Sequence, residues 1–212
     1  KGIEAKFIRD KLEAYGNLND GDSGLARRIQ YALNWIGDFG EPELPPVSLS
    51  EEEKTAIKDK KVVLLGAGGA ARAIARGLKR NGVEMVILDH PAEQAEALAR
   101  LVRAEGFGGF DQISAITSAD ILINATPVGM WPKVDESLVP KELLHPELAV
   151  FDIVYNPRET KLIAEAREVG CPVVYGYKMF LYQAARQFEL FTGHEAPLLE
   201  MEEVLIKALK GE

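Results

Sequence analysis

The stretch VVLLGAGGAA, residues 62–71, decides the fold of this chain. The apolar run Val62–Leu65 has the length of a buried strand, and the Ala- and Arg-rich run 71–81 after the glycines predicts a helix. Gly66 permits the tight turn between them, and Gly68 allows a pyrophosphate to approach backbone N–H groups at the helix N-terminus. This strand–turn–helix context favours a dinucleotide site over a tight turn without a ligand. The predicted site residues of the turn are Gly66, Ala67, Gly68, Gly69 and Ala70.

The chain after residue 60 alternates short apolar runs with helical patterns. We expect further strands at 83–88, 121–125, 148–154 and 172–174, and further helices at 92–105, 159–169, 178–191 and 199–210. Because short buried strands alternate with helices, the sequence predicts an α/β fold, a Rossmann-type doubly wound parallel sheet with right-handed crossovers. We assign residues 60–212 to this dinucleotide-binding domain. Residues 1–59 are assigned to a mainly helical N-terminal segment that includes a Pro- and Gly-containing linker at 37–50.

Composition narrows the classes of function. Of 212 residues, 47% are hydrophobic and 27% are charged, and the apolar runs are too short to cross a bilayer. The formal net charge of -8 disfavours nucleic acids and anionic membranes as partners. Cys171 is the single cysteine and the three histidines have no metal-ligand spacing, so we expect no disulfide and no metal site. A reducing, cytoplasmic location fits this composition best.

Asp89 follows the second predicted strand. It lies in the zone, about 20 residues after the glycines, where a carboxylate accepts a hydrogen bond from a ribose 2′-hydroxyl. Because a carboxylate also repels a 2′-phosphate, we predict NAD as the cofactor in preference to NADP. Two alternatives stay open. Asp89 is also placed to cap the following helix, and Arg72, Arg100 and Arg103 are candidates for contact with a phosphate.

Four motifs occur in order along the chain. They are GAGGA at 66–70, NATPVGM at 124–130, DIVYNP at 152–157 followed by Thr160, and GYKMFLYQ at 176–183. Together they resemble the shikimate dehydrogenase family, over about residues 60–209. The resemblance implies an NAD- or NADP-dependent oxidoreductase of the shikimate pathway, in aromatic amino acid biosynthesis, that interconverts 3-dehydroshikimate and shikimate. A sister branch of that family interconverts quinate and dehydroquinate, commonly with NAD.

The resemblance also implies contacts for individual residues. Cofactor contacts are implied for Ile153 and Gly176, and substrate contacts for Tyr155 and Gln183. Cofactor contacts are also predicted for Met179, which shares a helix face with Gly176, and, from their place after the third predicted strand, for Asn124, Thr126, Pro127 and Met130. Small and hydroxyl side chains at the end of the third predicted strand leave room for a ribose and a nicotinamide. Three of these residues have a plain structural alternative. Met130 can fill the core, Tyr155 can be a buried tyrosine bonded to backbone, and Gln183 can be solvated.

The N-terminal part departs from the family pattern. Family members carry a substrate lobe with a Ser-x-Ser pair, an Asn-Val-Thr-x-Pro-x-Lys stretch and an Asn-Thr-Asp stretch, and the first two are absent here. Residues 16–24 loosely resemble the third, which makes Asp20 the candidate catalytic residue, with turn chemistry as the alternative. Since residue 1 is not Met, we expect a fragment or an atypical member, as a monomer or homodimer. The alternative functions are an NAD-binding module without turnover, and an oxidoreductase for another hydroxy acid or cyclitol.

Overall fold

The structure, a computed structural model, describes residues 57–210, and its centre is a parallel sheet. The strands are β1 Lys61–Leu65, β2 Glu84–Leu88, β3 Gly106–Gly108, β4 Ile121–Asn124, β5 Ala149–Asp152 and β6 Val173–Tyr175. Their order is β3-β2-β1-β4-β5-β6, and every neighbouring pair is parallel. From β1 to β3 successive strands are added towards one edge of the sheet, and from β4 to β6 they are added towards the other edge. The direction of strand addition therefore reverses between β1 and β4. In open α/β sheets ligands bind at this reversal, beyond the carboxyl ends of the strands.

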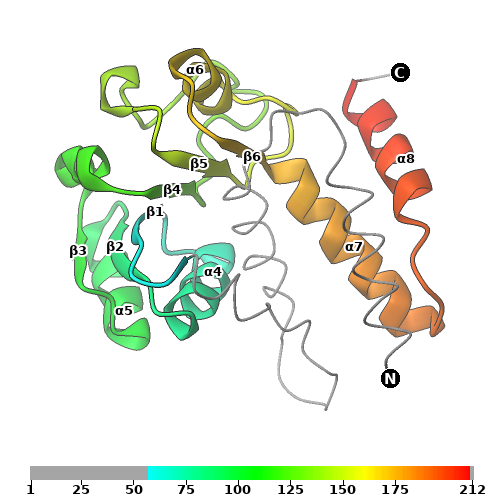
Figure 1. Cartoon of the computed structure of the whole chain (residues 1–212), viewed down its shortest axis with the longest axis horizontal. Helices are drawn as coiled ribbons and strands as arrows, with labels where there is room; N and C mark the ends of the chain where they lie inside the picture. The colour runs from blue at the N-terminus through cyan, green and yellow to red at the C-terminus, as the bar shows by residue number, and fades with distance from the viewer. Residues whose placement is uncertain (1–56, 211–212) are drawn as a thin grey trace.

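Helices cover both faces of the sheet (Figure 1). On one face lie α4 Gly69–Arg80 and α5 Ala92–Val102. On the other lie the 3-10 helices η2 Phe110–Ser118 and η3 Lys141–Leu143, together with α6 Lys161–Val169. α7 Gly176–Thr192 leaves the end of β6, and α8 Leu198–Lys210 packs along it. No helix within residues 57–210 is long and apolar enough to cross a membrane.

The central strands are buried on both faces, which explains their unbroken apolar sequence. Val62 and Leu64 of β1 face the core beneath α4 and α5, whereas Val63 and Leu65 face the core beneath η2 and α6. Each of these side chains is at most 2% exposed. Burying such a side chain contributes about 1.5–3 kcal/mol. The two cores therefore hold β1 firmly, and with it the start of the glycine turn.

The fold class and the doubly wound parallel sheet are confirmed, with local differences. The sequence does not predict β3, because Gly106–Gly108 has no apolar alternation. The helix expected over 92–105 ends at Val102, since Arg103 has a left-handed φ of 57° and closes the helix with its N–H on the Ala99 carbonyl. α7 starts at Gly176, before the expected start. The helices expected within residues 1–56 lie outside the described residues, so the division of the chain at residue 60 stays a prediction.

Candidate functional site

The turn after β1 requires glycine at position 66 for the fold itself. Gly66 has a φ of 100°, which disfavours residues with a side chain. A Cβ on Gly66 would lie 2.8 Å from the carbonyl oxygen of Ala125 in the loop after β4. The Gly66 N–H donates to the carbonyl oxygen of Leu88 at the end of β2 (2.7 Å). The turn is therefore fixed against both strands that flank β1.

Gly68 and Gly69 have no such role in the fold. A Cβ added to either would meet no atom within 4 Å, and Gly68 has an extended conformation with φ of -71°. Gly68 is the N-cap of α4, it offers no side-chain cap, and the first turn of α4 contains no acidic residue. The first N–H groups of a helix have no partner within the helix, and the helix dipole favours an anion beside them. The open space at these glycines fits a pyrophosphate.

Asp89 holds the glycine turn from the end of β2. Its Oδ2 accepts a hydrogen bond from the Ala67 N–H (2.9 Å), and its Oδ1 accepts one from the His90 N–H (2.7 Å). The N-cap of α5 is Pro91, without a side-chain hydrogen bond, so the alternative that Asp89 caps this helix is wrong. Each carboxylate oxygen accepts more than one hydrogen bond. Asp89 therefore keeps acceptor capacity for a ribose hydroxyl at the mouth of the turn.

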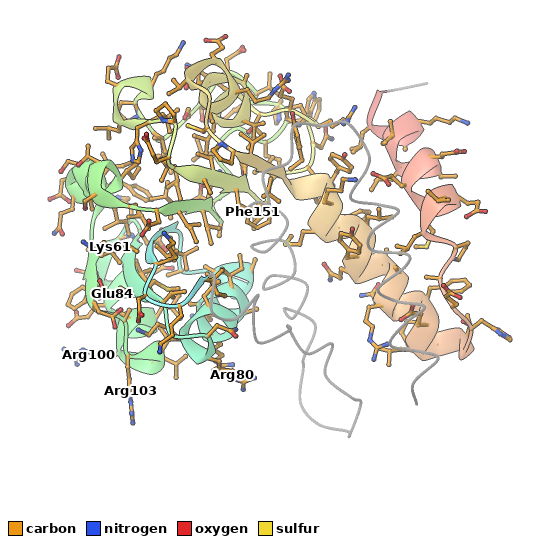
Figure 2. The ribbon with its side chains drawn as sticks, in the orientation of Figure 1. Lys61, Arg80, Glu84, Arg100, Arg103 and Phe151 are labelled. Atoms are coloured by element: carbon orange, nitrogen blue, oxygen red, sulfur yellow. The ribbon has the colours of Figure 1, made fainter. Side chains whose placement is uncertain are left out.

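Of the three arginines considered for phosphate contact, Arg72 lies nearest the turn, in the first turn of α4. Arg100 lies in the last turn of α5, and Arg103 is the C-cap of that helix. A crossover helix runs back against the strands, so both lie towards the amino edge of the sheet. Figure 2 shows them on the same side as Lys61 and Glu84, at the starts of β1 and β2. The structure does not bring Arg100 or Arg103 to the glycine turn.

A buried polar network lies behind the ends of β4 and β5. It consists of Asn124, Thr126, Asp152 and Thr160, each at most 8% exposed. Asn124 Nδ2 donates to Asp152 Oδ1 (2.9 Å), and Asn124 Oδ1 accepts from the N–H (3.1 Å) and the hydroxyl (2.7 Å) of Thr126. Asp152 Oδ1 also accepts from the Val154 N–H (3.0 Å), and Oδ2 accepts from the Thr160 hydroxyl (2.7 Å). The network joins the loop after β4 to the loop after β5.

Asp152 is the centre of this network. Burial raises the pKa of Asp152 to about 6, against the hydrogen bonds from Thr160, Val154 and Asn124, which lower it. Burial thus favours the neutral form of the Asp152 carboxyl, whereas the three hydrogen bonds favour its charged form. Three donors point at it, and hydrogen bonds to a charged acceptor are strong, which offsets part of the cost of burying the charge.

The residues assigned to the nicotinamide and the substrate lie on the loops after β4 and β5 and on α7. Met130 is 47% exposed and Tyr155 is 40% exposed, so the alternatives of a core methionine and a buried tyrosine are wrong. The Tyr155 ring stacks on Phe180 of α7 with the ring centroids 4.8 Å apart. Pro127 is also exposed. This edge of the domain thus offers apolar rings and a thioether to a ligand.

On α7, Gly176, Met179 and Gln183 follow one another at helical spacing and share a side of the helix. Gly176 is buried, and Met179 packs with Ile153 against the core beneath α4 and α5. Gln183 is exposed, so its amide is accessible to a ligand and to solvent alike. Asp20, the catalytic candidate, lies outside the described residues.

Sequence reasoning missed the part played by Asp152 and Thr160. The available signal was that two adjacent buried strands end in an amide and a carboxylate, and the register indeed pairs Asn124 with Asp152. Such a pair on the core side of a sheet indicates a hydrogen bond. Within residues 57–210, no group of three or more His, Cys, Asp and Glu side chains is placed to hold a metal ion.

This sheet order, with a glycine turn after the first strand, defines the class of doubly wound α/β proteins that bind dinucleotides at the strand reversal. Comparison with known families is more specific. The model of shikimate/quinate 5-dehydrogenases matches residues 48–169, and that of the shikimate 5′-dehydrogenase C-terminal domain matches residues 176–206. The chain therefore belongs to the shikimate/quinate 5-dehydrogenase family, as its motifs indicate.

Individual relatives agree with this assignment. Shikimate dehydrogenase (NADP(+)) of Methanobrevibacter smithii is 46% identical over 166 residues, which are 74% of this chain and 59% of the relative. A crystal structure of shikimate dehydrogenase in complex with NADP+ is 37% identical, with a TM-score of 0.66 over 72% of this chain and 56% of that one. Quinate dehydrogenase from Corynebacterium glutamicum in complex with NAD is 29% identical, with a TM-score of 0.67 over 86% of this chain and 61% of that one. This chain thus spans less than two thirds of the length of these relatives.

Proposed function

We propose that this chain binds NAD at the glycine turn and is the cofactor part of a dehydrogenase acting on shikimate or quinate. The observation that carries the proposal is the pair Gly68 and Gly69, which the fold does not require and which leave open space before α4. A pyrophosphate would take the free N–H groups there, and the ribose would meet Asp89. The named relatives, which are NADP(+) or NAD enzymes, support a nicotinamide cofactor.

The bound nicotinamide would exchange a hydride with the substrate's carbinol carbon. The chain's own part would be to orient the two rings, with Ile153, Gly176 and Met179 against the nicotinamide and Tyr155 and Gln183 against the polyol. We assign no general acid among residues 57–210, and such an acid contributes typically about 10²–10⁴-fold to the rate. The chain spans 59% of the length of the Methanobrevibacter smithii relative. Binding of the cofactor without turnover is therefore the second candidate function.

Two measurements on the same sample separate these functions. The chain is mixed with NAD and either shikimate or quinate, and the appearance of reduced nicotinamide is followed by its absorbance. NAD binding is titrated by calorimetry in parallel. Turnover with either substrate supports the dehydrogenase, and the KM for that substrate should then rise in Gln183→Ala. Binding without turnover supports the second function. An absence of NAD binding contradicts both.

Cofactor choice provides a separate prediction. Residues 89–92 after β2 read DHPA, with the Asp89 carboxylate and no Lys or Arg to meet a 2′-phosphate. We expect NAD to bind at least about tenfold more tightly than NADP at about pH 8, a difference of about 1.4 kcal/mol. Asp89→Asn keeps an oxygen for the Ala67 N–H but removes the charge, so the preference for NAD should shrink by about tenfold.

The measurement is a pair of calorimetric titrations, NAD and NADP, on the wild-type chain and on Asp89→Asn. Asp89→Ala serves as the control for the turn, because it also removes the acceptor of the Ala67 N–H and should weaken both cofactors. A wild-type chain that prefers NADP, as its curated relatives are named to do, contradicts the prediction. So does a preference that Asp89→Asn leaves unchanged.

A further inference from the structure

The loops after β4 and β5 hold five of the residues assigned to cofactor and substrate, and one buried side chain connects the two loops. The β4 loop carries Thr126, Pro127 and Met130, and the β5 loop carries Ile153 and Tyr155. Asp152 is fully buried and lies at the end of β5. Asp152 is thus an interior carboxylate with hydrogen bonds to Asn124, directly before the β4 loop, and to Val154 in the β5 loop.

The donors and acceptors of this network can be assigned consistently, starting from the backbone. The Thr126 backbone N–H can only donate, so the Asn124 oxygen faces it and the Asn124 amide nitrogen faces Asp152 and the Val128 carbonyl. Thr126 then donates its hydroxyl proton to Asn124, and its oxygen accepts from the Val128 N–H (3.3 Å). The β4 loop is therefore held in place by its own buried polar groups. This series of hydrogen bonds ends at the Asp152 carboxylate.

The other half of the network orders the β5 loop. Asp152 accepts from the Val154 N–H, two residues on, and from the Thr160 hydroxyl, eight residues on. Thr160 in turn accepts from the Ile163 N–H and caps α6. The segment 153–159, which carries Ile153 and Tyr155, is thus held near both of its ends by hydrogen bonds from Val154 and Thr160 to the Asp152 carboxylate. The glycine turn has no hydrogen bond to Asp152 and is held instead by Asp89 and Leu88.

From this we propose that Asp152 is a positioning residue that sets the β4 and β5 loops for the nicotinamide half of the dinucleotide, while the adenosine half is bound independently of it. The inference rests on the proposed function. It separates the site into two parts with different supports: Asp89 and the α4 N-terminus for the adenosine diphosphate, and the Asp152 network for the nicotinamide. A residue needed only for folding would affect both parts alike.

ADP-ribose distinguishes these possibilities, because it has the adenosine diphosphate and the second ribose but no nicotinamide. Calorimetric titrations of NAD and of ADP-ribose are made on the full chain as wild type, Asp152→Ala and Asp152→Asn. In wild type, NAD should bind more tightly than ADP-ribose. In Asp152→Ala, ADP-ribose affinity should stay within about twofold, while NAD affinity falls about tenfold, towards that of ADP-ribose. Asp152→Asn keeps an oxygen for Asn124 and Val154 and can donate to the Thr160 oxygen, so it should recover the preference for NAD.

A second readout does not depend on any ligand. Backbone hydrogen exchange should become faster in residues 125–131 and 153–159 of Asp152→Ala and stay unchanged in the glycine turn, because the turn is held by other bonds. If Asp152→Ala does not fold, Thr126→Val, which removes one hydroxyl donor from the network, should give the same selective loss of NAD affinity to a smaller extent.

The outcomes are distinct. If Asp152→Ala loses NAD affinity and ADP-ribose affinity to the same extent, the positioning role is overturned. It is also overturned if the ratio of the two affinities and the backbone hydrogen exchange of both loops stay as in wild type. A wild-type chain that binds neither compound overturns the proposed function instead, and the exchange measurement then decides alone whether Asp152 orders the two loops.

Discussion

Replacing Gly176 with alanine is expected to lower the free energy of unfolding by about 3 kcal/mol and to weaken NAD binding by about tenfold, towards the affinity for ADP-ribose. A Cβ on Gly176 would lie 2.5 Å from both the carbonyl carbon and oxygen of Ile153, and closer still to the carbonyl oxygen of Val154. These are backbone atoms of the loop after β5, which cannot rotate away as a side chain can. The first turn of α7 and this loop would have to separate.

The measurement is urea denaturation followed by circular dichroism, with calorimetric titration of NAD at low denaturant. Gly69→Ala is the matched control, since its Cβ meets nothing within 4 Å and alanine is a good helix former. It should change stability by less than about 0.5 kcal/mol. If Gly176→Ala is as stable as wild type, α7 does not pack closely on the β5 loop.

Asn124→Asp is expected to destabilise the chain by about 3–5 kcal/mol at about pH 8. The substitution is nearly isosteric, but it replaces the amide that donates to Asp152 over 2.9 Å by a carboxylate oxygen. Two carboxyl groups would then face each other in the core, away from solvent. Such groups raise each other's pKa, and one must keep its proton.

The pH dependence identifies the cause of this loss. In Asn124→Asp the folded state binds a proton more tightly than the unfolded state, so its stability relative to wild type should recover as the pH falls from about 8 towards the unfolded-state pKa of about 4. Burial already raises the pKa of Asp152 to about 6 in the wild-type chain.

Adding Asp152→Asn restores one amide opposite one carboxylate, and the double variant should recover part of the stability at about pH 8. Chemical denaturation of the four chains across this range measures both effects. A loss that neither acid nor the second substitution reduces would show that repulsion between carboxylates is not its origin.

The sequence was sufficient for the parts of the fold that have strong periodic signals. β1, β4 and β5 are continuous apolar runs because helices cover both sheet faces, and the glycine turn is specified by Gly66, whose φ of 100° a side chain disfavours. β3 could not be predicted, since Gly106–Gly108 is ordered by its pairing with β2 rather than by its own residues.

The site was predictable as a set of positions but not as a set of contacts. Asn124 and Thr126 were assigned to the cofactor because small polar residues follow a strand. In the structure their side chains bond to each other and to Asp152, so their first role is to fix the loop. Long-range pairs such as Asn124 with Asp152 depend on the strand order, which local sequence patterns do not determine.

Binding of NAD to the wild-type chain and to Gly68→Asp, measured by calorimetry beside urea denaturation, tests the central claim most directly. Gly68 is the N-cap of α4 with an extended backbone, the conformation in which an aspartate caps well. The new carboxylate would take the N–H groups meant for the pyrophosphate and repel its charge. We predict that Gly68→Asp is as stable as wild type or more stable by about 1 kcal/mol, and that it no longer binds NAD. Equal NAD affinity in the two chains would contradict the claim that the α4 N-terminus holds the cofactor.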